Sequence, residues 1–424
     1  MTEEQTTWRK VPQKDVINLI RQHHSKFGIS RIADITGLDQ VGIPVCIAIR
    51  PVSKTLALSS GKGITLDSSF ISAGMEAIET HTAEFINPSL FNNVSWSSLP
   101  KNERLNPSVL KPYLRVDDFL NLNISWLECD ITTDVSNKAY LPASLIGLSS
   151  DCLAEPVRIF RTGSNGLASG LSNKEAYLSA LYELIERDAM QCWRYAMQFR
   201  GLKQGYIRTS SIPFESTSGL ISRLNDIGIE VFIFDYTTDI EIPVYRCLIS
   251  GDIDNAVPLC QGFGCHDSHE IALNRAITEA VQARTVLISG ARDDYTYSTL
   301  KSSYRDYKEF IAHQRRIICE DYQPINSDFI DVDQSIDKIH SSFERCDIGH
   351  IYKYDFQEVD PFHVTRVVIP GLVPLTSHSH EQSIYGRQIE HPRLIKFSPK
   401  IDGIRRLIFS LHPANSNQSQ SNRL

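Results

Sequence analysis

The chain has 424 residues, of which 42% are hydrophobic and 22% are charged, and its formal net charge is -7 at pH 7. This balance is typical of a globular protein with one large domain or two. Lysine and arginine form no long run, so neither nucleic acid nor an anionic membrane is the expected partner. The chain has no uninterrupted apolar stretch of about 18 residues that would span a membrane. Its first residues, MTEEQTTWRK, lack a signal-peptide core, which favours a cytoplasmic location.

Nine cysteines are scattered along the chain, and none of them forms a CxxC pair. A zinc ribbon is therefore not expected, because such sites use closely spaced cysteines. We expect reduced and mostly buried thiols.

Apolar and alternating runs predict strands and helices throughout the chain. In chain order, they predict a strand over 43–50, a helix over 66–86, a strand over 124–131, a helix over 173–197, strands over 229–236 and 242–249, a helix over 268–288 and a strand over 363–370. Because strands and helices are mixed, the expected fold class is α+β, or mixed α/β. Residues 1–40 are expected to form an N-terminal cap, residues 41–412 one unit, and the polar tail 413–424 a disordered segment.

Three of the helical segments repeat one pattern. They are SAGMEAIET (72–80), SALYELIER (179–187) and RAITEAVQA (275–283). Each starts with Ser or Arg, has Glu four residues later, and has Glu or Gln three residues after that. Each follows a glycine-containing segment that we expect to be a turn: SSGKG (59–63), SNGLASG (164–170) and QGFGC (261–265).

Helix geometry places the polar residues of each copy on one stripe. At about 100° per residue, positions i and i+4 lie about 40° apart, and positions i+4 and i+7 about 60° apart. The three stripes are Ser72, Glu76 and Glu79; Ser179, Glu183 and Glu186, with Arg187 beside them; and Arg275, Glu279 and Gln282. The remaining positions are apolar enough to pack, so the three stripes could converge on one cavity.

Crowded carboxylates repel one another, and a divalent cation removes that repulsion. Their hard oxygen atoms suit Mg²⁺, which usually shares its coordination sphere with phosphates and water. Arg187 and Arg275 could then bind phosphate oxygens. The pattern thus favours a Mg²⁺–nucleotide site without a P-loop, because Gly61–Lys62–Gly63 is too short to form one. A solvated helix face, or a duplicated packing unit without chemistry, remains an alternative at this point.

The stretch SNGLASGLSNKEAYLSALYELIERDA, residues 164–189, resembles the signature of YcaO-domain proteins, and the resemblance extends over about 30–400. The other two copies fall where that family has its first and third ATP-site helices. The resemblance implies a repeated strand–helix fold and an ATP- and Mg²⁺-dependent enzyme that activates a backbone amide of a ribosomally made precursor peptide. The amide oxygen attacks the γ-phosphate, a nucleophile adds to the carbon, and phosphate leaves. A neighbouring Cys, Ser or Thr side chain gives an azoline, and sulfide gives a thioamide.

The resemblance also implies roles for single residues. It implies that Glu183 and Arg187 are catalytic. It implies ATP contacts from Lys14, Ser72, Glu76, Glu175, Glu183, Arg187, Arg275 and Glu279. It implies metal ligation by Glu76, Glu79, Glu183, Glu186 and Glu279.

The chain departs from the family pattern at several places. Many members have Gly-Asn-Thr where this chain has Gly170, Leu171 and Ser172, and an Arg where it has Thr80. Peptide-cyclising members commonly end in PxPxP, whereas this chain ends in HPANSNQSQSNRL. Residues 29–51 resemble members that work with a TfuA-type partner and form thioamides. We therefore favour thioamide over azoline formation, with both products left open, and we expect a TfuA-like or leader-peptide-binding partner protein. Family members also often form homodimers.

Two other functions stay open. The departures at Leu171 and Thr80 would suit a non-catalytic, ATP-binding accessory protein or scaffold for another peptide- or protein-modifying enzyme. A peptide-binding module, in which the acidic helices are only structural, is the third candidate and predicts no binding of Mg²⁺–ATP.

Four residues beside the third glycine segment also have expected places. Cys265 is expected to be a small residue in a turn rather than a sulfur carrier. His266 and His269 are expected on the surface rather than as metal ligands. Ser268 is a predicted N-cap of the third helix.

Overall fold

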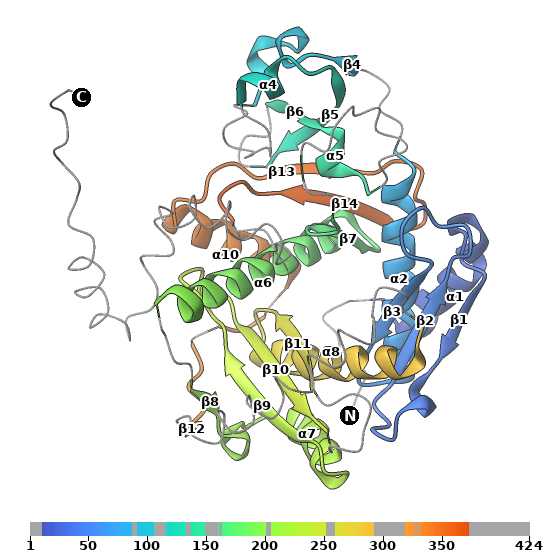
Figure 1. Cartoon of the computed structure of the whole chain (residues 1–424), viewed down its shortest axis with the longest axis vertical. Coiled ribbons are helices and arrows are strands. Elements are labelled where there is room, and N and C mark those ends of the chain that lie inside the picture. The colour runs from blue at the N-terminus through green and yellow to red at the C-terminus, as the bar shows by residue number, and fades with distance from the viewer. Residues whose placement is uncertain are drawn as a thin grey trace, which may run out of the picture. The chain divides into compact units, whose positions relative to one another are not determined.

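The computed structural model describes residues 11–86, 91–105, 116–132, 137–148, 160, 163–200, 205–251, 259–291, 319–325, 327–329 and 331–372. All of them belong to one compact unit, Met1–Leu375. The fold is mixed helix and sheet, which confirms the expected class (Figure 1). In the described residues, none of the helices combines the length and the apolar character needed to cross a bilayer.

In the described part of the chain, the strands form three sheets. The first sheet has the order β1 (Arg31–Asp34), β2 (Val45–Ile49) and β3 (Leu58–Lys62). The second has the order β4 (Phe91–Val94), β5 (Ile124–Ile131), β13 (Tyr352–Asp355), β14 (His363–Val368) and β7 (Leu167–Gly170), with β6 (Lys138–Pro142) also paired to β5. The third has the order β11 (Leu259–Cys265), β10 (Val244–Ser250), β9 (Glu230–Asp235), β8 (Tyr206–Ile207) and β12 (Cys319–Glu320). All pairings are antiparallel except that of β8 with β12.

The helices pack between and around these sheets. They are α1 (Gln13–His23), α2 (Leu66–Glu84), α4 (Val116–Leu120), α5 (Ala143–Ile146), α6 (Asn173–Arg200), α7 (Glu215–Asp226), α8 (His269–Ser289) and α10 (Val332–Arg345). The three predicted long helices correspond to α2, α6 and α8, and the five predicted strands to β2, β5, β9, β10 and β14, so these predictions are confirmed. Ser268 caps α8, as predicted: its hydroxyl accepts the N–H of Ile271 at 3.4 Å.

The prediction that the three glycine-containing segments are turns is wrong for 59–63 and 261–265, which lie in strands, and is confirmed for the start of 164–170, where the N–H of Leu167 donates to the carbonyl of Ser164 at 2.8 Å. The three segments overlap β3, β7 and β11, each of which is an edge strand of its own sheet. Their glycines serve close packing: a Cβ at Gly61, Gly170 or Gly264 would lie within 3.0 Å of backbone atoms of the helix that follows. Each edge strand therefore lies directly against the backbone of its own helix, which any side chain at these positions would prevent.

Each sheet also meets a second acidic helix. Helix α2 contacts β3 and β7, α6 contacts β7 and β11, and α8 contacts β11 and β3. The buried side chains of each edge strand pack against both of its helices, because alternate residues of one strand face different helices. In β7, for example, Leu167 packs in the cluster around α2 and Ala168 in the cluster around α6.

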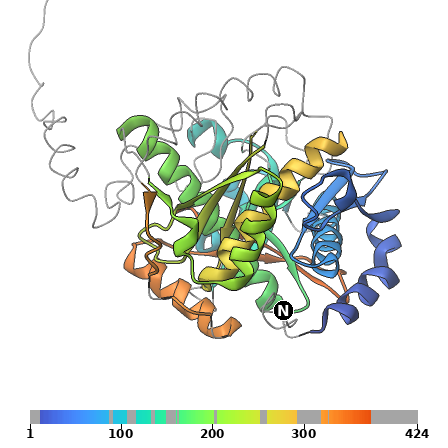
Figure 2. The ribbon, with the colours of Figure 1, turned by 90° about the horizontal axis from the view of Figure 1, so that it is seen from below.

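By these contacts, the three acidic helices and the three sheets alternate around a closed ring, and Figure 1 shows α2, α6 and α8 around its centre. In the view from below, the gold helix α8 extends toward the blue N-terminal elements, in agreement with its contacts with β3 (Figure 2). Both faces of the third sheet are covered. In β10, Tyr245 and Cys247 face the cluster of α7 and α8, whereas Val244 and Leu248 face the cluster of α6 and α10. The ring brings the three edge strands β3, β7 and β11 toward one centre.

The glycine packing gives a stability prediction. Gly264→Ala should lower the free energy of unfolding by about 1–3 kcal/mol or more, because the added methyl group would collide with the backbone of α8. Gly219→Ala is the matched control: Gly219 lies in the interior of α7 with open space around it, and alanine there should add about 0.5–1 kcal/mol. Denaturant unfolding of both variants measures the difference. Equal stability of the two variants would contradict the proposed role of the glycine strands.

Candidate active site

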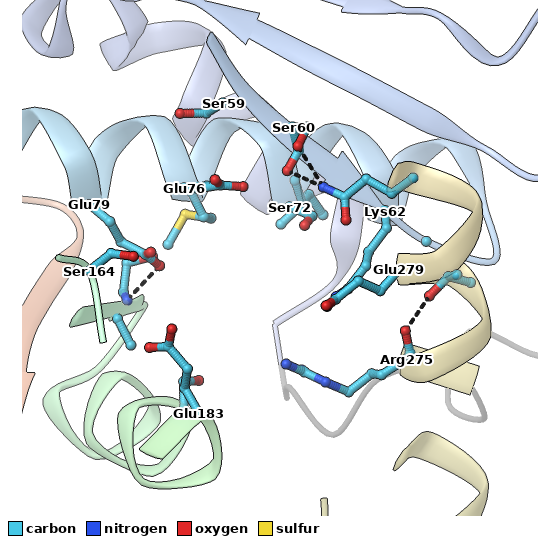
Figure 3. A pocket seen from close by; sticks show the side chains of 18 of the residues that line it. Ser59, Ser60, Lys62, Ser72, Glu76, Glu79, Ser164, Glu183, Arg275 and Glu279 are labelled. Atoms are coloured by element: carbon cyan, nitrogen blue, oxygen red, sulfur yellow. Dashed lines mark hydrogen bonds and ion pairs between the residues drawn. The ribbon is translucent and has the colours of Figure 1, made fainter. Parts of the chain in front are cut away.

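A cavity of about 840 Å³ lies where the three acidic helices and the three edge strands meet. All ten stripe residues line it: Ser72, Glu76, Glu79, Ser179, Glu183, Glu186, Arg187, Arg275, Glu279 and Gln282. Figure 3 shows the carboxylates of α2, α6 and α8 directed toward the same space. The structure therefore brings together three stripes that are about 100 residues apart in the sequence.

On α2, Glu79 reaches across the cavity wall to β7. Its Oε1 atom accepts hydrogen bonds from the backbone N–H of Ser169 at 2.8 Å and from the Ser169 hydroxyl at 2.7 Å. Burial, with a smaller contribution from the nearby carboxylates Glu76 and Glu183, raises the pKa of Glu79 to about 8 against the hydrogen bonds from Ser169, which lower it. In the absence of a cation, this carboxyl group is protonated up to about neutral pH.

On α6, Arg187 lies between two carboxylates. Its guanidinium is 3.7 Å from Glu183 and 3.5 Å from Glu186, while Glu183 also accepts the backbone N–H of Gly166 at 2.9 Å. Burial raises the pKa of both glutamates, and Arg187 opposes that shift. The Nε atom of Arg187 is buried without a hydrogen-bond partner. Arg187 is therefore held by charge but retains a donor that an incoming oxygen could use.

On α8, Glu279 is compensated by cations. It forms an ion pair with Lys62 of β3, and its other oxygen accepts the N–H of Phe263 at 3.4 Å. Burial alone would raise the pKa of Glu279, but Lys62, Arg187 and Arg275 outweigh burial and lower it. This end of the cavity therefore carries an ionised carboxylate within a group of basic side chains.

Two stripe residues tie neighbouring parts of the ring together. Gln282 of α8 donates to the backbone oxygen of Ser60 at 2.7 Å and to its hydroxyl at 2.8 Å. Gln282 and Glu79 occupy the same position of the repeat, and each joins its helix to the edge strand of another copy. The glutamine is needed at this place because a carboxylate could not donate to the carbonyl oxygen of Ser60.

The lining of the cavity suits a Mg²⁺–nucleotide complex. It carries five carboxylates (Glu76, Glu79, Glu183, Glu186 and Glu279) and three cations (Lys62, Arg187 and Arg275). Among the described residues, no three His, Cys, Asp or Glu side chains are close enough to hold a metal ion. Carboxylate oxygens are instead paired with Ser169, Gly166, Arg187 and Lys62. Oxygen donors of this kind and number fit Mg²⁺, and the surplus of carboxylates would be neutralised by it.

Two residues with an implied nucleotide contact lie elsewhere. Lys14 is exposed on α1 and does not line the cavity. Glu175 does not line it either: its carboxylate accepts the N–H of Leu171, just before α6, at 3.0 Å, and its own N–H donates to the capping hydroxyl of Ser172 at 3.2 Å. Thr80 lines the cavity, with its hydroxyl donating to the backbone oxygen of Glu76 at 2.7 Å.

Two basic residues, one lining the cavity and one beside it, were not predicted as part of the site. Lys62 lies in the Gly-Lys-Gly segment that is too short for a P-loop, and β3 places it opposite Glu279. Arg366 lies in β14 within the pattern HVTRVV, where a charged residue at a buried strand position is the only signal in the sequence.

The residues around Cys265 are buried, not exposed. Cys265 ends β11 rather than lying in a turn, and burial together with Glu186 raises the pKa of its thiol. The expectation that His266 and His269 are surface residues is wrong, since they are 0% and 7% exposed. The His269 imidazole forms a hydrogen bond with the Tyr245 hydroxyl at 2.7 Å, so this side chain is part of the buried core. The eight cysteines in the described residues are free, and seven of them are buried.

Comparisons with known proteins find relatives over most of the chain. A family model described as YcaO cyclodehydratase, ATP- and Mg²⁺-binding, matches residues 60–373. The chain is 33% identical, over 86% of its length and 88% of the relative, to an uncharacterized protein in the tfuA 3′ region of Rhizobium leguminosarum bv. trifolii. It is 29% identical to an uncharacterized protein of Methanothermobacter thermautotrophicus over 82% of this chain and 90% of that protein.

Solved structures with the same fold share little sequence with the chain. The YcaO protein from Methanopyrus kandleri bound with AMPPCP and Mg²⁺ has a TM-score of 0.66 at 20% identity, covering 86% of this chain and 92% of that chain. A heterocyclase in complex with substrate and cofactor has a TM-score of 0.64 at 19% identity, covering 92% of this chain but 57% of that chain. A chain of the E. coli microcin synthetase McbBCD complex with pro-MccB17 bound has a TM-score of 0.61 at 16% identity, covering 80% and 88%.

The fold and the acidic cavity define a nucleotide-site architecture built from three repeated strand–helix units. The chain belongs to the YcaO family of ATP- and Mg²⁺-binding cyclodehydratases.

The raised pKa of Glu79 gives a pH prediction for the metal-free protein. The folded-state pKa of about 8 is above the ordinary value of 4.5, so the stability linked to the protonated carboxyl group is fully present below pH 4.5 and is lost as the pH rises through about 8. Glu79→Gln removes this titration. Relative to the wild type, the variant should therefore gain stability between pH 5 and pH 9, as measured by denaturant unfolding in a chelator.

Glu344→Gln is the control for this measurement, because Glu344 is an exposed glutamate on α10. It should follow the wild type across the whole pH range. A parallel pH profile for Glu79→Gln and the wild type would contradict the raised pKa.

Proposed function

We propose that the chain is an ATP- and Mg²⁺-dependent enzyme that activates a backbone amide of a ribosomally made precursor peptide. A bond forms between the amide oxygen and the γ-phosphorus while the bond from that phosphorus to ADP breaks. A nucleophile then adds to the amide carbon, and phosphate leaves with the former amide oxygen. The observation that carries this proposal is the convergence of three acidic stripes and three basic side chains on one cavity.

The residues of the cavity divide into two groups by charge. Glu76, Glu79, Glu183, Glu186 and Glu279 would hold Mg²⁺, which supplies charge neutralisation at the phosphate oxygens. Lys62, Arg187 and Arg275 would bind the phosphates directly. Arg187 suits this role because its Nε atom is a spare buried donor between two carboxylates.

Sulfide is the nucleophile we favour, which makes the product a thioamide. The relative from Rhizobium leguminosarum bv. trifolii lies in the tfuA 3′ region, and residues 29–51 of this chain resemble TfuA-associated members. The buried Cys265 thiol, whose pKa is raised, does not suit a sulfur carrier, so the sulfur would come from outside the chain. Azoline formation, with a neighbouring side chain as the nucleophile, is the competing outcome.

A precursor peptide and a second protein are the proposed partners. The tfuA neighbourhood of the relative supports a TfuA-like protein, and one structural neighbour is part of a synthetase complex with a bound pro-peptide. The charged residues that line the cavity would bind mainly the nucleotide and Mg²⁺. The partner would therefore deliver the peptide.

A non-catalytic accessory role is the second candidate. It is supported by Leu171 and Glu175, because the family's Asn is replaced at position 171 and the Glu175 carboxylate is occupied by the N–H of Leu171. This role requires nucleotide binding without turnover that depends on the peptide.

Mass spectrometry of the peptide distinguishes these outcomes. A precursor peptide encoded near the gene is incubated with the chain, the neighbouring gene products and Mg²⁺–ATP, with and without sulfide. We expect a mass gain equal to the replacement of oxygen by sulfur, only when sulfide is present. Loss of one water without sulfide would establish azoline formation instead, and unchanged peptide with bound ATP would favour the accessory role.

Glu183→Gln is the variant that tests the site in the same assay. It keeps the size of the side chain but removes the charge that faces Arg187, so peptide-dependent ATP turnover should fall at least about 100-fold. Glu344→Gln on the exposed face of α10 is the matched control and should keep full turnover. Wild-type turnover in Glu183→Gln would rule out this cavity as the active site.

A further inference from the structure

Arg366 is a buried arginine on β14 beside the cavity. It is 5% exposed, and its guanidinium donates to two backbone carbonyl oxygens: Nε to Leu145 at 3.0 Å and Nη2 to Gly163 at 2.6 Å. Gly163 lines the cavity, and Glu183 is the charged side chain that raises the pKa of Arg366 against burial. Arg366 thus lies just outside the cavity wall that carries Glu183.

The backbone segment between Arg366 and Glu183 is held at both ends. Arg366 fixes the carbonyl of Gly163, and the N–H of the next residue, Val367, donates to the carbonyl of Gly166 at 2.8 Å. Gly166 has a φ of +76°, a conformation that favours glycine, and its N–H donates to Glu183 at 2.9 Å. The segment 163–166 therefore links the Arg366 guanidinium to the Glu183 carboxylate.

Burial of an arginine at this place has two costs. Burial lowers its pKa to about 10, and its Nη1 atom has no hydrogen-bond partner. An apolar side chain of similar volume would avoid both costs. What an apolar side chain would not supply is the donor to Gly163, and with it the fixed position of the segment.

We propose that Arg366 is a positioning residue for Glu183, which holds the segment 163–166 so that the Gly166 N–H keeps the Glu183 carboxylate directed into the cavity. The inference rests on the proposed function in one respect: Glu183 is taken to act on the Mg²⁺–nucleotide complex. The positioning itself is a property of the chain without ligand. Supporting groups of this kind typically change metal affinity or activity by about 10–100-fold.

The first experiment needs no activity. Amide hydrogen exchange of residues 164–167 is measured in the metal-free full-length protein. Arg366→Met should speed this exchange, and Arg366→Lys should do so less, because lysine retains one donor for a carbonyl oxygen. Arg208→Met, at an exposed arginine paired with Asp321, is the control and should leave the segment unchanged. Unchanged exchange in both Arg366 variants would overturn the proposal.

The second experiment tests the link to Glu183. Binding of Mg²⁺ and a non-hydrolysable ATP analogue is measured for the wild type, Arg366→Lys, Glu183→Gln and the double variant, each first shown to be folded. We expect Arg366→Lys to weaken this binding about 10-fold, or to lower turnover about 10-fold in the peptide assay with an unchanged KM for the peptide. The double variant should bind no more weakly than Glu183→Gln alone. Additive losses would overturn positioning through Glu183. A wild type that binds no nucleotide would remove the proposed function, while the exchange experiment would still decide the role of Arg366.

Discussion

Crowding of carboxylates in one partly desolvated cavity is the constraint on which the rest of this structure depends. Five glutamates face three cations there, and burial raises the pKa of Glu79, Glu183 and Glu186. Without a ligand, the protein manages this charge with backbone N–H groups, with Ser169 and with the ion pairs of Lys62 and Arg187. When a Mg²⁺–nucleotide complex binds, Mg²⁺ would take over the neutralisation of the carboxylates, and the basic side chains would bind the phosphates.

The ring of three helices and three sheets makes this crowding sustainable. Each helix lies against the glycine-containing edge strand that precedes it and also contacts the edge strand of another copy. Glu79 and Gln282 add hydrogen bonds across these contacts. Apolar clusters cover both faces of the third sheet. The apolar faces of α6 and α8 pack in these clusters, and their polar stripes face the centre of the ring.

The stripes could be predicted from the sequence because helix periodicity alone fixes which side chains share a face. The strands β3, β7 and β11 could not, since glycine is commoner in turns than in strands and its use here depends on a helix that packs against it. Lys62 reaches the cavity through the edge-strand placement of β3, and Arg366 lies beside the cavity through the pairing of β14 with β7 and β13, which no local pattern reveals. The nucleotide contacts predicted for Lys14 and Glu175 came from the resemblance rather than from spacing, and both residues lie outside the cavity. The buried state of His269 depends on Tyr245, a partner on another strand.

The most direct test of the central claim is the effect of nucleotide and metal on the stability of the protein. Thermal unfolding is measured with a non-hydrolysable ATP analogue plus Mg²⁺, with each alone, and with the analogue plus a chelator. Binding at 100 times Kd should stabilise the fold by about 2.7 kcal/mol, and only when the two ligands are present together. Glu183→Gln should lose most of this gain. No stabilisation by the pair, or the same stabilisation in chelator, would contradict a cavity whose carboxylates are balanced by Mg²⁺ and nucleotide.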